Sequence, residues 1–254
     1  MTLTLLVTVL PALALGAALG FFGGLFGIGG GIIAIPILVV GFGMDQATAQ
    51  GTALVMMVPN LMVAWWRYVR RNPVGLAGAA GLAVVATLTT WAGAQLAQNL
   101  DQRFLQVLFA LFLAVLGVLQ MRGAAGDGAP GPARLPQRLL PLVGLAGGGS
   151  MGLLGVGGGL VATPLITGCF GLGQRMAQSL ALALVTPSSA MALYTYADHR
   201  RVDWAIGLPL AAGGVVTVAA GVALAHAWSE RTLRRAFGLM LIGTAAVLVL
   251  RRLL

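Results

Sequence analysis

Long uninterrupted apolar stretches alternate with short polar or basic segments along the whole chain. Residues 1–44, 46–66, 72–100 and 204–229 contain no aspartate, glutamate or arginine. A single membrane-spanning helix needs about 20 apolar residues, so each of these stretches has room for at least one span. The pattern predicts an all-α polytopic membrane protein.

Turn residues and charges divide this pattern into ten apolar segments, five on either side of a glycine- and proline-rich piece. The second segment of each set is short: at 1.5 Å per residue it covers about 21 Å, against a hydrocarbon core of about 30 Å. Each short segment is therefore expected to be a tilted short helix or a re-entrant one. The segments are expected at residues 3–22, 30–43, 46–66, 73–97 and 103–121, and at 134–152, 158–171, 174–196, 204–226 and 232–250.

An internal duplication with an offset of 128 residues relates the two sets. GLFGIGGGIIAIP at 24–36 returns as GLLGVGGGLVATP at 152–164. We divide the chain into a first transmembrane repeat (1–122), a linker (123–138) and a second repeat (139–254). Internal repeats are a common plan in transporters, and five crossings per half would make them inverted whereas four would make them parallel. We favour the inverted arrangement, because it sets broken helices against each other near the midplane.

Composition and charge agree with a membrane protein. Hydrophobic residues make up 59% of the 254, charged residues only 8%, and the mean hydropathy is +0.95. Soluble domains carry about a quarter charged residues, so an aqueous globular fold is excluded. The net charge of +9 comes from arginines clustered at the ends of apolar runs, which is typical of topology signals rather than of a nucleic-acid surface.

Arginine placement also predicts the orientation in an inner or plasma membrane. With either number of crossings, ten of the fifteen arginines fall on the side that holds the linker 123–138 and the 67–71 loop. The positive-inside rule therefore places the linker in the cytoplasm. It does not separate the inverted from the parallel repeat.

The two triglycine runs are the strongest candidates for a binding site. Three consecutive glycines cost a helix about 1 kcal/mol each, so we expect a break and a fresh helix start at about Ile32 and Leu160. A helix start offers free N–H groups and a partial positive charge to an anion. The alternative is close helix packing through small residues. The expected anion ligands are the backbone groups of Gly29, Gly30, Gly31, Gly157, Gly158 and Gly159.

Polar residues of the third segments extend this hypothesis. Prolines free a backbone carbonyl one turn back, and Asn60, Ser188 and Ser189 adjoin Pro59 and Pro187. These three side chains are expected to contact the substrate. We further assign Gln50 and Gln178 to gating and Arg67 to attracting anions at the cytoplasmic mouth. Hydrogen bonding between helices is the alternative role of the glutamines and of the three proline-flanking residues.

Several other chemistries are excluded or left as alternatives. No carboxylate lies within a span, which argues against a carboxylate-coupled pump. The single cysteine, Cys169, excludes an internal disulfide, and we expect no metal site and no cofactor. An intramembrane Ser/His hydrolase built on Ser150 and His226 is one alternative, although Ser150 lacks the surroundings of a nucleophile elbow. An anion channel without alternating access is another.

The glycine motifs and their continuations resemble the TauE/SafE family of sulfite-exporter-like membrane proteins. The similarity is carried by GLFGIGGGIIAIPIL with AQGTAL at 49–54, and by GLLGVGGGLVATPLI with AQSLAL at 177–182. The resemblance implies a permease or exporter of small anions, often sulfite or organosulfonates such as sulfoacetate. The expected partners are this anion and the lipid bilayer, with homo-oligomerisation left open and nucleic acid excluded.

Overall fold

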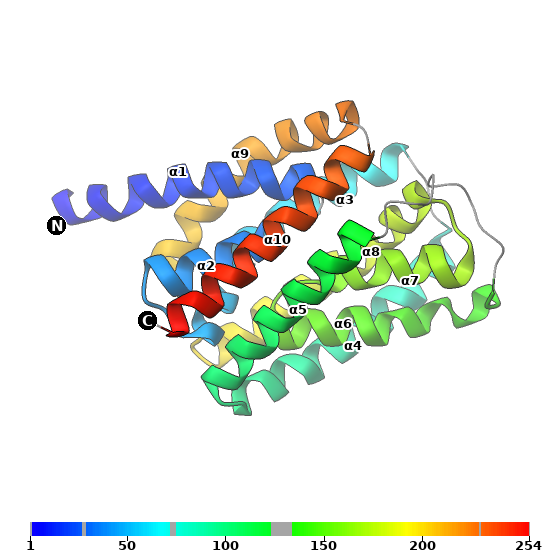
Figure 1. Ribbon diagram of the computed structural model, residues 1–254, viewed down its shortest axis with the longest axis horizontal. Helices are drawn as coiled ribbons and strands as arrows, with labels where there is room; N and C mark the ends of the chain where they lie inside the picture. Colours follow the sequence, from blue (N-terminus) through cyan, green and yellow to red (C-terminus); the bar gives the residue numbers. More distant parts are fainter. Residues whose placement is uncertain (1, 27–28, 72–74, 123–133, 229, 254) are drawn as a thin grey trace.

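The computed structural model describes residues 2–26, 29–71, 75–122, 134–228 and 230–253, and every regular element in them is a helix (Figure 1). The first five are α1 (Thr2–Phe26), α2 (Gly31–Gly41), α3 (Gln46–Arg71), α4 (Leu76–Asn99) and α5 (Gln102–Arg122). The others are the 3-10 helix η1 (Gln137–Leu142), α6 (Val143–Leu154), α7 (Gly158–Phe170), α8 (Gln174–Asp198), α9 (Trp204–Ala227) and α10 (Glu230–Leu253). Residues 123–133 of the expected linker lie outside the described residues.

Helix lengths confirm the prediction of an all-α polytopic membrane protein. Among the described residues, six helices are long and apolar enough to cross a bilayer: α1, α3, α4, α5, α8 and α9. The two short segments are helices of 11 and 13 residues, α2 and α7, and at 1.5 Å per residue they measure about 17 and 20 Å. Neither of them alone is long enough for the hydrocarbon core.

Glycines allow two pairs of long helices to pack backbone to backbone. On α1, a Cβ at Gly16 or Gly20 would collide with the backbone of α9 at Leu210 or Gly214. On α6, a Cβ at Gly148 would collide with the Ala86 backbone of α4. Small residues are the usual means of close approach between membrane helices.

The packing keeps its pattern when the two halves are exchanged. Helix α1 packs along α9 and α6 along α4, while α3 lies against α9 and α8 against α4. Helices α3 and α8 also cross each other, and α5 lies along α10. An offset of 128 residues pairs α1 with α6, α3 with α8, α4 with α9 and α5 with α10, so this exchange symmetry is what a duplication would produce.

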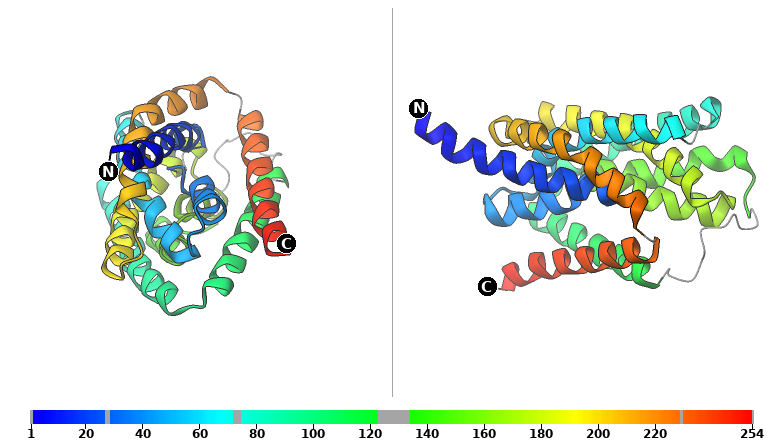
Figure 2. Two further views of the ribbon diagram at one scale, coloured as in Figure 1. Left: turned by 90° about the vertical axis from the view of Figure 1, so that its left-hand side faces the viewer. Right: turned by 90° about the horizontal axis from the view of Figure 1, so that it is seen from above.

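Corresponding helices run in opposite directions. Figure 1 shows α5 (green) and α10 (red) side by side and antiparallel, and both chain ends lie at one end of the molecule in Figure 2. This favours inverted over parallel repeats. The exact boundaries of the repeats remain a prediction from the sequence.

The carboxylates that the sequence places outside the apolar segments cap helices at one end of the molecule. Asp45, Asp101 and Asp203 each accept a backbone N–H from the first turn of α3, α5 and α9. A carboxylate at a helix N-terminus accepts hydrogen bonds from N–H groups that have no partner within the helix. Its negative charge also interacts favourably with the positive end of the helix dipole. Arg201 in addition lies 3.3 Å from Asp45, joining the loop after α8 to the start of α3.

Candidate functional site

Both triglycine runs break their helices, as the sequence predicted. In the first run Gly29 and Gly30 have φ of 69° and 87°, and α2 begins at Gly31. In the second run Gly157 has φ of 93°, and α7 begins at Gly158. Positive φ is a conformation that glycine adopts at little cost. The new helices begin one and two residues earlier than the expected starts.

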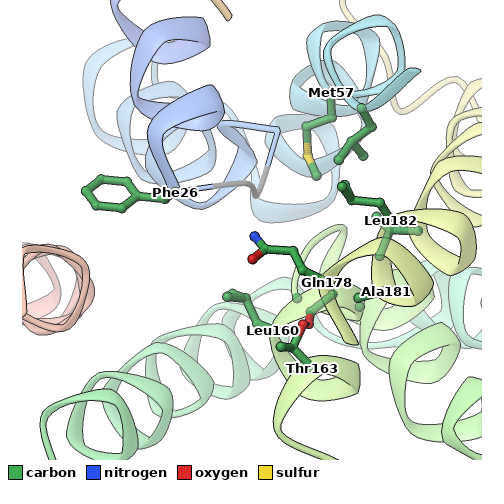
Figure 3. Close-up of a pocket in the computed structure, with 12 residues that line it drawn as sticks. Phe26, Met57, Leu160, Thr163, Gln178, Ala181 and Leu182 are labelled. Carbon is green, nitrogen blue, oxygen red and sulfur yellow. The ribbon is translucent and has the colours of Figure 1, made fainter. Parts of the chain in front are cut away.

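A cavity of about 50 Å³ lies at the start of α7 (Figure 3). One water needs about 10–15 Å³ on this measure, so the space suits a few waters or one small oxyanion. The walls come from both halves of the chain: Phe26, Met57, Leu61, Gly157, Gly158, Gly159, Leu160, Thr163, Gln178, Ala181, Leu182 and Val185.

Backbone N–H groups of α7 are the main polar feature of this cavity. The first turn closes when the Val161 N–H donates to the Gly157 carbonyl at 2.9 Å. The three preceding N–H groups, of residues 158–160, have no acceptor within the helix. Two of these residues are glycines, so no side chain covers the positive end of the helix dipole.

Gly159 is the most open of the three glycines. A Cβ built on it would lie 3.4 Å from Val185 Cγ2 and 3.9 Å from Ala181 Cβ, both of which line the cavity. By contrast, a Cβ on Gly158 would lie 2.9 Å from the carbonyl oxygen of Gly147. Gly159 therefore keeps the cavity open, whereas Gly158 also allows α6 and α7 to pack closely.

Two polar side chains complete the lining. Figure 3 shows the Gln178 amide projecting into the space that Phe26, Leu160 and Met57 surround, and no described residue hydrogen bonds to that amide. The Thr163 hydroxyl donates to the Gly159 carbonyl at 2.7 Å. No side chain in the lining is charged. The site therefore offers N–H donors without a full positive charge, which suits weak binding of an anion.

The first triglycine run is packed behind the cavity wall, against two residues that line the cavity. A Cβ on Gly31 would collide with the Met57 sulfur, and one on Gly29 would lie 3.0 Å from Leu61 Cγ. Neither glycine is among the residues that line the cavity. The structure thus brings the second run, and not the first, to the cavity.

The proline-flanking residues lie off the cavity and are fully buried. Ser188 donates to the Leu184 carbonyl and Ser189 to the Thr186 carbonyl, both at 2.8 Å and within α8. The Asn60 amide has no hydrogen-bond partner among the described residues. The two serine hydroxyls thus bond to the backbone of their own helix, as is common for serine in membrane helices, and they form no bond between helices.

The remaining sequence candidates are distributed along the bundle. Arg67 is exposed near the end of α3, away from the cavity lining. Gln50 is fully buried, and its Oε1 accepts from the Tyr196 hydroxyl at 2.6 Å. Ser150 donates to the Gly147 carbonyl of its own helix at 3.0 Å, and the His226 side chain lies outside the described residues.

The sequence analysis did not predict that Thr163 and Phe26 line the cavity, or that Tyr196 donates a hydrogen bond to Gln50. Thr163 had a local signal, because a threonine four residues after a glycine donates to that glycine's carbonyl in a helix. Tyr196 also had one, since the offset of 128 pairs it with Tyr68. Phe26 had none, because only the tertiary fold brings the end of α1 to the start of α7.

The chain matches the family described as sulfite exporter TauE/SafE over residues 12–248. A probable membrane transporter protein from Xylella fastidiosa (strain 9a5c) is 30% identical over 245 residues, covering 93% of each chain. A probable membrane transporter protein from Methanocaldococcus jannaschii is 27% identical over 166 residues, covering 62% of this chain and 61% of the relative. No solved structure matches the chain.

Proposed function

The chain belongs to the sulfite exporter TauE/SafE family and is a multi-pass membrane transporter, and from this premise we propose that it moves small sulfur oxyanions or organosulfonates such as sulfite or sulfoacetate. The family also sets aside the intramembrane hydrolase alternative. The substrate binds in the cavity at the start of α7, on the N–H groups of residues 158–160 and the Gln178 amide.

The observation that carries this proposal is a helix start without covering side chains beside a partly open cavity. An anion in the cavity exchanges its hydrating water molecules for backbone N–H donors that are already oriented. Its negative charge lies at the positive end of the helix dipole, which is favourable. The absence of an arginine from the lining keeps binding weak enough for release, which transport requires. A volume of about 50 Å³ suits the sulfite-sized head group rather than a long chain.

Orientation follows from the distribution of charge. The arginines at the end of α3, around the linker and at the starts of α8 and α10 outnumber those at the opposite end by ten to five. In our proposal this end faces the cytoplasm of a cell with an inner or plasma membrane. An interior-negative potential then favours export of the anion by about 2.3 kcal/mol per charge per 100 mV.

Liposome flux measurements test the proposal. Purified protein is reconstituted, and uptake of sulfite, sulfate, sulfoacetate and taurine is measured with and without an imposed potential. We expect saturable flux for at least one sulfur anion, accelerated by a potential of the right sign. Flux without saturation or counterflow would instead support an anion channel.

A substitution at Gly159 connects this flux to the cavity. Gly159→Ala adds a methyl group beside the free N–H groups and is expected to weaken substrate affinity about tenfold, while the helix gains about 0.5–1 kcal/mol in stability. Gly168→Ala is the matched control, because it lies on the same helix with no atom within 4 Å of the new Cβ. If the two folded variants bind the substrate with equal affinity, the anion does not bind in this cavity.

A further inference from the structure

Three glutamine side chains with buried, unpartnered amide groups lie outside the cavity described above. Gln46 and Gln50 on α3 are 3% and 0% exposed. Both amide atoms of Gln46, both of Gln98 on α4, and Nε2 of Gln50 have no hydrogen-bond partner among the described residues. A buried amide without a partner destabilises a fold, and more so in a membrane, where water does not compensate.

Helix packing relates Gln50 and Gln98 to the same turn of backbone, between α6 and α7. A Cβ on Gly155, in the turn between α6 and α7, would lie 3.0 Å from Gln50 Cβ. Helices α4 and α6 run in parallel register, with Gly148 against Ala86 and Gly152 against Thr90 and Ala94. Because α6 ends at Leu154, this register puts Gln98, one turn beyond Ala94 on α4, level with the α6–α7 turn.

Gln50 is held in place by its own contacts. Its Oε1 accepts the Tyr196 hydroxyl at 2.6 Å, and that hydroxyl lies 3.1 Å from the Gly152 carbonyl oxygen. With the oxygen engaged, the NH₂ group is the end that remains unpartnered. The bond thus fixes Gln50 as a donor.

The same face of α3 connects these amides to the cavity. Gln46, Gln50, Met57 and Leu61 fall within an arc of about 60° on a helix of 3.6 residues per turn, and the last two residues line the cavity. Gln50 precedes Met57 by seven residues, or about 10 Å along the axis. The amides therefore lie between the cavity and the end of the molecule where α3 begins.

We propose that Gln46, Gln50 and Gln98 form a second station for the transported anion, closed in this conformation and reached after the cavity at the start of α7. The inference rests on the function proposed above. Amide NH₂ groups donate to oxyanions without adding charge, so the ion can be held briefly and released. A second station of this kind also explains why the fold tolerates five unpartnered amide atoms.

Gln98→Met tests this station, because the substitution breaks no hydrogen bond made by a described residue. Gln95→Met is the matched control, one turn earlier on α4 and half-buried. Gln98→Met is expected to lower the initial rate of sulfite or sulfoacetate flux in liposomes about tenfold, with an equal or higher thermal midpoint. Gln98→His, which keeps an N–H donor, is expected to restore flux at least in part.

These experiments distinguish failure of the proposed function from failure of the second station alone. If wild-type protein transports none of the tested anions, the proposed function fails and the station fails with it. If wild-type protein transports them, and Gln98→Met and Gln46→Met transport as fast as Gln95→Met while melting at a higher temperature, the amides are only structural and the station alone is overturned. Should Gln98→Met not fold, Gln46→Met carries the same test.

Discussion

A single pair of side chains explains why one of two nearly identical glycine runs borders the cavity and the other is packed. The offset of 128 pairs Met57 with Val185. Met57 fills the space beside Gly31, where its sulfur would collide with a Cβ, whereas Val185 stays 3.4 Å from a Cβ on Gly159. The longer side chain therefore closes one helix start, and the shorter one leaves the other open.

Val185→Met is expected to close the second helix start as well. A methionine at this position would enter the cavity of about 50 Å³ and reduce substrate affinity at least tenfold, because an anion held by N–H donors cannot be accommodated beside an apolar chain in the same space. Binding to purified protein, measured by calorimetry, checks this. Unchanged affinity in a folded Val185→Met protein would contradict the assignment, and Val185→Ile serves as a milder control.

At the scale of the helix, adjacent glycines on α6 have different roles. Gly148 contacts the Ala86 backbone of α4, whereas a Cβ on Gly149 would meet no atom within 4 Å. Only the first glycine is needed for close packing between the two helices. The α1–α9 contact at Gly16 and Gly20 repeats this arrangement in the other half.

Gly148→Ala and Gly149→Ala are expected to have opposite effects on stability. The first forces two backbones apart and should cost about 1–3 kcal/mol, while the second should be neutral or gain about 0.5–1 kcal/mol from helix propensity. Thermal unfolding in detergent compares the two variants. Equal thermal midpoints would show that α6 and α4 can move apart at Gly148 without a loss of stability.

Helix positions could be predicted from the sequence, but the site only in part. Apolar run lengths and the triglycine runs determine where helices begin and break, and the break after Leu154 follows from backbone conformations that favour glycine. The hydrogen-bond partners of the Ser188 and Ser189 hydroxyls could not be predicted. The same serine in a membrane helix can donate to its own backbone or to a ligand, and the sequence does not distinguish the two. The Met57–Val185 difference mattered only once packing brought each residue to a helix start.

At the scale of the whole molecule, the two ends of the bundle carry different charge. Capping aspartates gather at the end that holds both chain termini, together with Asn99 at the α4–α5 corner, whereas the linker end is rich in arginine. Lipid headgroups and the membrane potential both act on such an asymmetry.

Cysteine labelling checks the orientation. In a Cys169→Ala background, Asn99→Cys and Gln137→Cys place single exposed thiols near opposite ends of α4, on whose first turns η1 packs. A membrane-impermeant thiol reagent added to intact cells should label Asn99→Cys, and should label Gln137→Cys only after the membrane is permeabilised. The reverse pattern would place the linker outside the cell and invert the proposed direction of export.

The backbone-to-backbone seams of α1 with α9 and of α6 with α4 also give the protein electrical insulation. Where a methyl group does not fit, neither a hydronium ion nor a hydrated sodium ion can leak through. We expect the voltage across the bilayer to fall mainly along the path past the helix breaks, and not along these seams. An anion that takes this path is expected to carry a current that can be measured with little proton leak.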